Sequence, residues 1–275
     1  MYVFGVAISF ISRLDCIAPR PASCAVGGPL AAMSPIPASV ETTLIMIMAI
    51  IGGFVLAKDA LSFLNVLYKT LIRPGKNLKK LGEWAVVTGA TDGIGKAMAF
   101  ELARKGLNVM LVGRSTEKLA AVKDELSALN IKVVTAVIDF TKFGLADAER
   151  VTKMLSELQV GVLVNNVGIS YPFPQWFHEL TDEEVDSLMT VNMQSVVWMT
   201  RAVLPQMIER KSGAVINLSS AAAKPPNPLL TVYASTKGFV ENFTKGLALE
   251  YKSKGISFQC QSPLYVATSI AAECG

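Results

Sequence analysis

Two kinds of hydrophobic pattern divide this sequence. Residues 42–57, TTLIMIMAIIGGFVLA, form an unbroken apolar run between Glu41 and Lys58, whereas from Glu83 onward short apolar runs alternate with amphipathic stretches. The unbroken run is typical of a membrane helix, although it is slightly shorter than the roughly 20 residues that usually cross a bilayer. Flanking residues can snorkel or the bilayer can thin; a buried or re-entrant segment is the alternative. We expect a membrane anchor, with residues 60–72 either extending the helix or lying along the interface.

From Glu83 the apolar runs have the length and composition of buried strands. Their nearly continuous Val, Ile and Leu content indicates strands that are covered on both faces, as in a parallel sheet. The runs are WAVVT, NVMLV, IKVVTAVI, VGVLVN, GAVINLS and GISFQC. Helix candidates lie between them, and the longest, residues 180–210, opens with Thr181 and Glu184 at capping-box spacing. This alternation predicts an α/β fold, a Rossmann-like doubly wound parallel sheet with helices on both faces, preceded by the membrane helix.

The patterns predict four segments along the chain. They are an irregular leader at 1–41, an anchor and juxtamembrane helix at 42–72, a basic linker at 73–82 and one α/β domain at 83–275. The leader is rich in Pro, Ala, Ser and Gly, and it is either part of a targeting signal or a disordered segment that carries no targeting information. Basic residues are more numerous after the anchor than before it, which predicts that the large C-terminal domain faces the cytosol. Those after it are Lys69, Arg73, Lys76, Lys79 and Lys80, and those before it are Arg13 and Arg20.

Composition narrows the possible functions. Hydrophobic residues make up 51% of the chain and charged residues 17%, an excess of apolar residues that favours membrane contact. The net charge of +4 comes without a dense Lys/Arg stripe or an interleaved aromatic ladder, so we expect no nucleic-acid partner. The four cysteines form no C-x-x-C or zinc-like cluster, so we expect no metal site. A Ser-His-Asp hydrolase could be built only around His178, the single histidine.

A glycine-rich loop follows the first predicted strand of the α/β domain. In TGATDGIG, residues 88–95, the glycines at 89, 93 and 95 let the backbone turn sharply and approach a pyrophosphate at the N-terminus of the next helix. We expect Gly89, Gly93, Ile94 and Gly95 to contact a dinucleotide; a plain tight turn is the alternative. The second strand ends at Arg114, followed by Ser115, where a carboxylate would favour NAD. A guanidinium suits the 2′-phosphate of NADPH, which is therefore the expected cofactor.

The stretch TVYASTK, residues 231–237, carries a second candidate for chemistry. Tyr233 and Lys237 stand four apart, so on a helix they share a face. A nearby ammonium favours the phenolate and makes a tyrosine, with an ordinary pKa of about 10, a better acid.

Together these motifs resemble the short-chain dehydrogenase/reductase family. The residues that carry the resemblance are TGATDGIG, NNVG at 165–168, Asn192 in VNMQS, the pair Ser219 and Ser220, and YASTK, in that family's order and spacing. Within the family, the segments LVNNVGISYPFPQWF and PPNPLLTVYASTKGFVENF, behind a membrane segment, are most similar to the very-long-chain 3-oxoacyl-CoA reductases of fatty acid elongation. The related 17-beta-hydroxysteroid dehydrogenases share much of this pattern.

The resemblance implies a role for each matching residue. It makes Tyr233 the general acid, Lys237 the group that acidifies it and binds the nicotinamide ribose, Ser220 rather than Ser219 the residue that holds the substrate carbonyl, and Asn192 the holder of a relay water. For the cofactor it implies contacts to adenine and its ribose from Asp139, Asn166 and Gly168. It further implies contacts to the nicotinamide carboxamide from Val266 and Thr268.

The function implied is NADPH-dependent reduction of a long-chain 3-oxoacyl-CoA to a 3-hydroxyacyl-CoA at the endoplasmic reticulum membrane. The implied partners are this substrate, the membrane and other elongation enzymes. Family members continue well past the position of Thr268, so we expect the chain ending at Gly275 to be truncated. Two alternatives stay open, a hydroxysteroid or retinoid dehydrogenase and a truncated cofactor-binding scaffold without activity.

Overall fold

The computed structural model describes residues 38–72, 75, 77–264 and 266. The predicted leader as far as residue 37, Arg73 and Lys76 of the basic cluster, and Thr268 lie outside the described residues. The chain divides into two compact units, 1–74 and 75–275, and each is described by itself. The predicted segment boundaries and the cytosolic orientation stay predictions.

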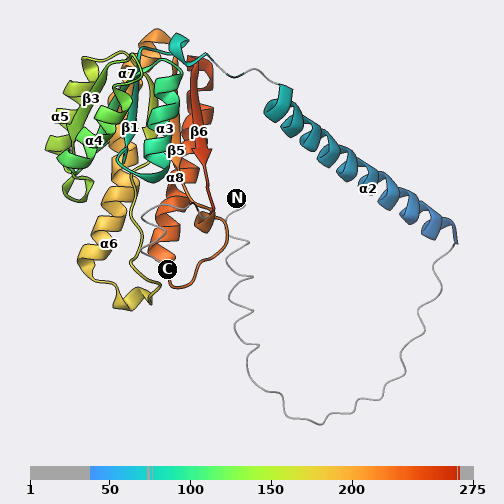
Figure 1. Cartoon of the computed structure of the whole chain (residues 1–275). Helices are drawn as coiled ribbons and strands as arrows, with labels where there is room; N and C mark the ends of the chain where they lie inside the picture. The colour runs from blue at the N-terminus through green and yellow to red at the C-terminus, as the bar shows by residue number, and fades with distance from the viewer. Residues whose placement is uncertain (1–37, 73–74, 76, 265, 267–275) are drawn as a thin grey trace. The chain divides into compact units, whose positions relative to one another are not determined.

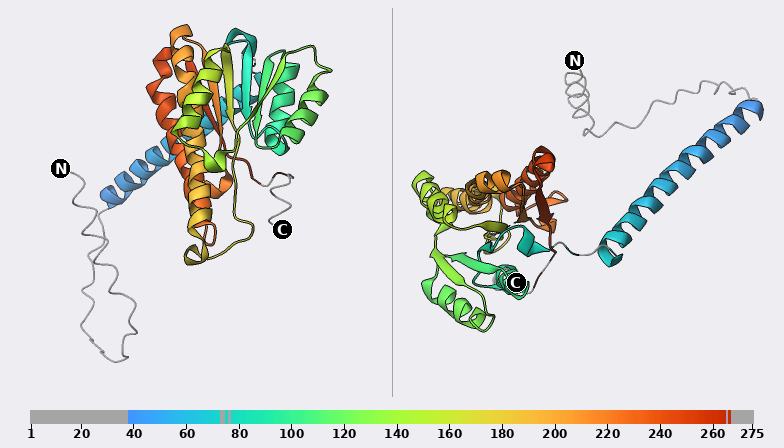
Figure 2. Two further views of the ribbon diagram at one scale, coloured as in Figure 1. Left: turned by 90° about the vertical axis from the view of Figure 1, so that its left-hand side faces the viewer. Right: turned by 90° about the horizontal axis from the view of Figure 1, so that it is seen from above.

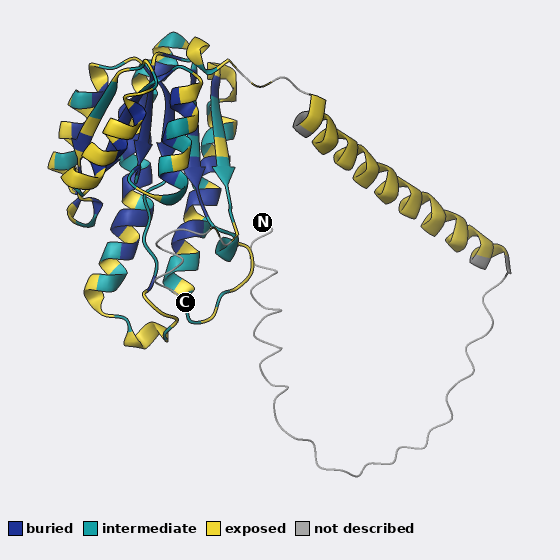
Figure 3. Cartoon of the chain, viewed as in Figure 1, coloured by how far each residue is buried: buried dark blue, intermediate teal, exposed yellow. Residues whose placement is uncertain are grey.

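The described residues of the first unit form a long helix, α2 (Ala38–Leu67), which continues into a π-helical turn, η2 (Tyr68–Ile72) (Figure 1). It begins four residues before the predicted start, and the stretch from residue 60 extends it. Thr42–Leu67 has a mean hydropathy of 2.1, and within the described residues it is the one helix long and apolar enough to cross a membrane. Figure 3 shows its surface exposed along its length, as expected for a helix whose apolar side chains face lipid.

The second unit is built on a six-stranded parallel sheet of order β3-β2-β1-β4-β5-β6. The strands are β1 (Trp84–Thr88), β2 (Asn108–Gly113), β3 (Val133–Val137), β4 (Val160–Asn165), β5 (Gly213–Leu218) and β6 (Ile256–Gln261). Each coincides within two residues with one of the six apolar runs. The predicted doubly wound fold is confirmed.

Helices cover both faces of this sheet (Figure 2). They are α3 (Gly93–Arg104), α4 (Thr116–Leu126), α5 (Leu145–Ser156), α6 (Asp182–Met189), α7 (Ser195–Arg210) and α8 (Thr231–Glu250). Alternate residues of β1 point to opposite faces. Val86 belongs to the core with Leu155 of α5 and Met199 of α7, whereas Val87 belongs to the core with Leu102 of α3. The central strands β1, β2 and β4 are therefore buried on both sides, which explains their nearly continuous apolar sequence, whereas the edge strands β3 and β6 are more exposed.

The long helix predicted at 180–210 is interrupted, which corrects the sequence reading. The capping box at its start is present, with Thr181 Oγ1 accepting from the Glu184 N–H at 3.2 Å. At Thr190–Gln194, however, the backbone forms a π-helical turn, η6, in which the Ser195 N–H donates to the Thr190 carbonyl five residues before it. The apolar periodicity continues through this turn, so the sequence pattern did not reveal it.

The strand order places the site. β1 lies between β2 and β4. The chain therefore leaves β1 toward one edge of the sheet and leaves β4 toward the other edge. Ligands of open α/β sheets bind in the crevice outside the carboxyl ends of the strands at this switch point.

Candidate active site

The glycine loop joins β1 to α3 at the switch point. Gly89 and Gly93 have φ of 63° and 54°, in the left-handed region that favours glycine. Asn166, just after β4, holds the loop, because its Nδ2 donates to the carbonyls of Thr88 at 3.1 Å and Gly89 at 3.0 Å. In return Thr88 Oγ1 accepts from the N–H groups of Asn166 at 3.0 Å and Val167 at 3.1 Å. The amide of Asn166 thus shapes the loop from within, and Thr88 is a contributor that the sequence reasoning missed.

Two other residues of this loop have different surroundings. Ile94 is half-buried and packs against the hydrophobic core on the α3 side of the sheet. Gly95 is buried, and a Cβ there would collide with the Gly89 carbonyl and the Asn166 amide. The third glycine is required by this close packing.

Substitution of Gly95 by alanine is expected to destabilise the fold by about 1–3 kcal/mol, the usual cost of overpacking, because one of the clashing atoms is fixed backbone. The measurement is denaturant unfolding of the full chain in detergent. Gly246→Ala is the matched control, since a Cβ there meets nothing within 4 Å and alanine in a helix gains roughly 0.5–1 kcal/mol. Equal midpoints for the two variants would contradict the packing argument.

A pocket of about 310 Å³ opens beside the loop. Its lining brings together Gly89 after β1, Arg114 after β2, Asp139 after β3 and Gly168 after β4. Arg114 is exposed. Hydrogen bonds from Thr141 are the main cause that lowers the pKa of the Asp139 carboxyl, and the charge of Arg114 adds to them. Four predicted cofactor residues from four different strand ends therefore share one pocket.

Ser115 and Val266 lie differently. Ser115 caps α4, its Oγ accepting from the Lys118 N–H at 3.2 Å, and it is not among the residues that line the pocket. Val266 is 40% exposed.

The pocket suits the adenosine part of a dinucleotide. Gly89 and Gly168 present backbone without side chains, the N–H groups at the start of α3 favour an anion, and Arg114 supplies a cation. In the described ranges no group of three or more His, Cys, Asp or Glu residues could hold a metal ion.

Tyr233 and Lys237 lie on α8, and Lys237 Nζ is 5.9 Å from the centre of the Tyr233 ring. Lys237 is buried, with 6% of its surface exposed, and its Nζ donates to the Leu218 carbonyl at 3.2 Å. Burial lowers the pKa of this ammonium from 10.5 to about 8, because the charged form loses its hydration. The two residues therefore share one face of the helix, with the ammonium beside the phenol ring.

Gly168 is the point where this helix meets the pocket. A Cβ at Gly168 would lie 2.9 Å from Lys237 Nζ and 3.2 Å from Asn192 Oδ1. Asn192, buried in η6, accepts from the Ile169 N–H at 2.9 Å and donates to the Ile169 carbonyl at 2.9 Å and to Thr236 Oγ1 at 3.0 Å. Its amide therefore ties the segment after β4 to α8.

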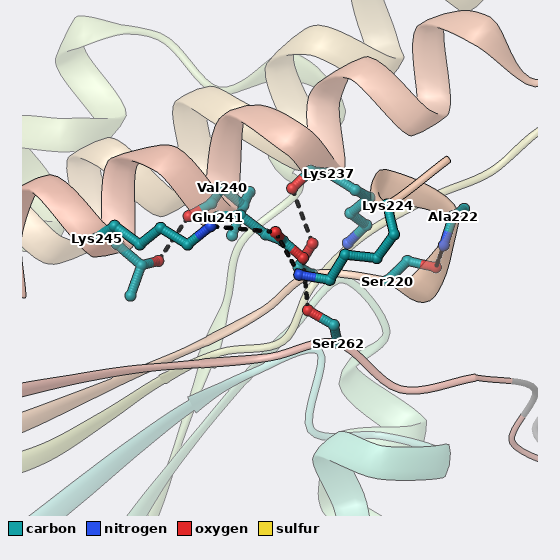
Figure 4. A network of polar contacts seen from close by, with 10 residues as sticks. Ser220, Ala222, Lys224, Lys237, Val240, Glu241, Lys245 and Ser262 are labelled. Atoms are coloured by element: carbon teal, nitrogen blue, oxygen red, sulfur yellow. Dashed lines mark hydrogen bonds and ion pairs between the residues drawn. The ribbon is translucent and has the colours of Figure 1, made fainter. Parts of the chain in front are cut away.

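The two adjacent serines differ in their surroundings. Ser219 is buried, and its Oγ donates to the Lys237 carbonyl at 2.8 Å, so it anchors α8 to the end of β5. Ser220 is half-buried at the start of a 3₁₀ turn, η7 (Ala221–Ala223), where its Oγ accepts from the Ala222 N–H at 3.2 Å (Figure 4). Of the two hydroxyls, that of Ser220 is the more accessible to a substrate.

A row of hydrogen-bonded, buried polar side chains lies behind the site and was not predicted from the sequence. Asn165 Nδ2 donates to Thr200 Oγ1 at 3.0 Å and to Asn217 Oδ1 at 2.8 Å, and Asn217 Nδ2 donates to Thr244 Oγ1 at 2.8 Å. These bonds connect α7, β4, β5 and α8. An asparagine in each of two otherwise apolar strands was the available signal.

Comparison with known proteins agrees with this geometry. Residues 83–275 match the family model described as short chain dehydrogenase. The chain is 48% identical over 194 residues to the very-long-chain 3-oxoacyl-CoA reductase of Bos taurus, covering 70% of this chain and 62% of that protein. It is also 48% identical over 194 residues to the very-long-chain 3-oxoacyl-CoA reductase-A of Danio rerio, covering 70% of this chain and 60% of that protein. The chain thus spans less than two thirds of the length of these relatives.

Solved structures show the same fold. A short-chain dehydrogenase from Sphingobium yanoikuyae in complex with NADPH has a TM-score of 0.65 at 30% identity, covering 70% of this chain and 75% of that one. A 3-oxoacyl (acyl-carrier-protein) reductase from Agrobacterium tumefaciens with NADP bound has a TM-score of 0.65 at 26% identity, covering 74% of this chain and 78% of that one.

Proposed function

This chain belongs to the short-chain dehydrogenase family, and on that premise we propose that it is an NADPH-dependent reductase that converts a long-chain 3-oxoacyl-CoA to the 3-hydroxyacyl-CoA. The observation that carries the proposal is the junction at Gly168, where the ammonium of Lys237 on the helix of Tyr233 reaches the lining of the cofactor pocket. The relatives named as 3-oxoacyl-CoA reductases support the choice of substrate.

The chemistry proposed for the chain's own residues is proton delivery and positioning. When bound, NADPH supplies the hydride to the ketone carbon. Tyr233 gives its phenolic proton to the carbonyl oxygen, and the positive charge of Lys237 lowers the cost of the phenolate that is left. Ser220 donates a hydrogen bond to the same oxygen and holds it in line with Tyr233. Asn192 keeps the segment after β4 against α8, and a relay water at Asn192 stays a prediction.

The two serines give a matched pair of expected results. Ser220→Ala is expected to lower kcat by roughly 10²-fold or more, because a donor to the developing alkoxide is lost, with little change in stability. Ser219→Ala is expected to lower the free energy of unfolding by about 1–3 kcal/mol, because the buried Lys237 carbonyl loses a donor. Steady-state kinetics and denaturant unfolding of both variants check this, and the reverse assignment of effects would contradict it.

The preference for NADPH is proposed from Arg114 at the pocket. Arg114→Ala is expected to weaken NADPH binding by roughly 10- to 100-fold, the loss of one charge-assisted hydrogen bond, and to leave NADH binding nearly unchanged. Fluorescence titration with both nucleotides measures the two dissociation constants. An equal loss for both would contradict contact with the 2′-phosphate.

We place the protein in the endoplasmic reticulum membrane through α2, with the reductase domain in the cytosol and other elongation enzymes as neighbours. The apolar and exposed helix Thr42–Leu67 supports the anchor, and the more numerous basic residues after it support the orientation. Protease protection of intact microsomes tests the orientation, since a cytosolic domain is digested without detergent.

The reaction is tested by NADPH oxidation with the full chain in detergent. A long-chain 3-oxoacyl-CoA is expected to give turnover. A sterol ketone tested in the same assay distinguishes this reductase from a hydroxysteroid dehydrogenase. Absence of turnover with the acyl-CoA would overturn the proposed function.

A further inference from the structure

A buried carboxylate on α8 lies between three segments of the proposed active site. Glu241 stands one turn after Lys237, with 7% of its surface exposed. Its Oε2 accepts from Lys224 Nζ at 2.7 Å, and its Oε1 accepts from Ser262 Oγ at 2.7 Å. Lys245 Nζ is 3.7 Å from Oε2. Figure 4 shows the carboxylate between these partners: Lys224 and Ser262 come from other segments, and Lys245 from the next turn of α8.

The first partner fixes the turn that carries Ser220. Lys224 ends η7, and its N–H donates to the Ala221 carbonyl at 3.0 Å. Ser220 begins the same turn. Since a turn this short has only a few backbone hydrogen bonds, holding one end restricts the position of the other.

The second partner fixes the segment after β6. Ser262 precedes Pro263, whose carbonyl accepts from the Ala221 N–H at 2.9 Å. The two branches from Glu241 therefore meet at Ala221, the residue directly after Ser220. The segment 262–264 continues toward Val266, for which a contact to the nicotinamide is predicted.

The negative charge of Glu241 suits it to hold Lys224 and Ser262 together, as a clamp between their two segments. The hydrogen bond from Lys224 is the main cause that lowers the pKa of the Glu241 carboxyl, so the group is ionised at neutral pH and accepts strong hydrogen bonds. The lowered pKa of Lys237 has a different cause, its own burial. The carboxylate of Glu241 therefore acts mainly on the positions of the surrounding segments and not on the pKa of Lys237.

We propose that Glu241 is a positioning residue that holds the Ser220 turn and the segment 262–264 in register with Tyr233 and Lys237. The inference rests on the proposed function, because register matters for turnover only if these residues act on one substrate. It goes beyond that function in naming a residue away from the reacting atoms on which the arrangement depends.

The test is a double-mutant cycle with full-length protein in detergent. Glu241→Gln is expected to lower kcat roughly 10- to 100-fold, because a small misplacement of a catalytic group slows the reaction. Here kcat is calculated from the concentration of NADPH-binding sites found by titration, and the affinity for NADPH should be unchanged. In the Ser220→Ala background the same change should have a clearly smaller effect, since the catalytic group on one of the two positioned segments is gone. Glu149→Gln, an exposed carboxylate on α5, is the control. Equal losses in both backgrounds, or no loss, would overturn the proposal.

A second measurement separates this inference from the proposed function. Hydrogen exchange of a peptide covering 219–224 needs no substrate. Its amides donate to carbonyls of the turn and of the segment after β6, so in Glu241→Gln they should exchange at least about tenfold faster than in wild type, as expected for local opening. If wild type does not reduce a 3-oxoacyl-CoA, the proposed function fails, while faster exchange still supports the clamp. Unchanged exchange in this peptide overturns it.

Discussion

Replacing Tyr233 by phenylalanine is expected to lower kcat for the proposed reduction of 3-oxoacyl-CoA by roughly 10²- to 10⁴-fold, the range ascribed to general acid catalysis. The change removes one oxygen from a half-buried side chain and keeps the ring beside Lys237 Nζ. The fold and NADPH affinity should therefore persist. Stopped-flow measurement of NADPH oxidation under single turnover isolates the chemical step from product release.

Tyr251→Phe provides the matched control for this loss of a phenol. Tyr251 follows α8, and its ring packs on Phe258 at 5.9 Å between centroids. Loss of its hydroxyl should leave kcat within about twofold of wild type, since the half-buried ring keeps its packing and the residue lies outside the proposed site. Wild-type turnover in Tyr233→Phe would refute the assignment of the acid.

Replacing Lys237 by methionine is expected to abolish measurable turnover and to make the protein more stable at pH 7. At this pH the ammonium is charged in both the folded and the unfolded chain, and burial opposes it, as the lowering of its pKa to about 8 shows. That shift corresponds to a gain on the order of 3 kcal/mol when the charge is removed, reduced by loss of the hydrogen bond to the Leu218 carbonyl. Denaturant unfolding of both proteins measures the difference.

The difference in the free energy of unfolding between wild type and Lys237→Met should depend on pH. Between about pH 8 and the ordinary lysine value of 10.5, folded wild type binds fewer protons at Lys237 than the unfolded chain, so its stability rises with pH. The advantage of methionine should therefore shrink over this window. Lys123→Met, at an exposed position of α4, should show no such dependence. A stability difference that stays constant from pH 7 to 10 would contradict burial as the cause.

The sheet could be predicted from the sequence because its signal is local. Most strands are apolar runs, and β4 coincides with VGVLVN residue for residue. The spacing of Tyr233 and Lys237 is likewise contained in one helical turn, and the ammonium does lie beside the ring. Both patterns depend on neighbours a few positions away, which a sequence displays directly.

The contacts that hold the site together could not be predicted, because each joins residues far apart in the chain. Asn166 reaches back to Gly89, and Glu241 reaches both Lys224 and Ser262. A polar residue on an amphipathic helix is ordinarily solvated, so nothing in KGFVENFTK marks Glu241 as buried. Tertiary packing decides its role.

The π-helical turn at Thr190–Gln194 sets the rotational phase between α6 and α7. A π turn contains one residue more than the α-helix it interrupts, and one residue of an α-helix corresponds to about 100° of rotation. Removing a single residue from the turn would restore regular helix and swing either the apolar side of α6 or the amide of Asn192 away from its partners. The spacing between Thr181 and Ser195 is therefore as much a property of the site as the residues themselves, and relatives that keep this geometry should tolerate substitutions in the turn outside Asn192 more readily than a change in its length.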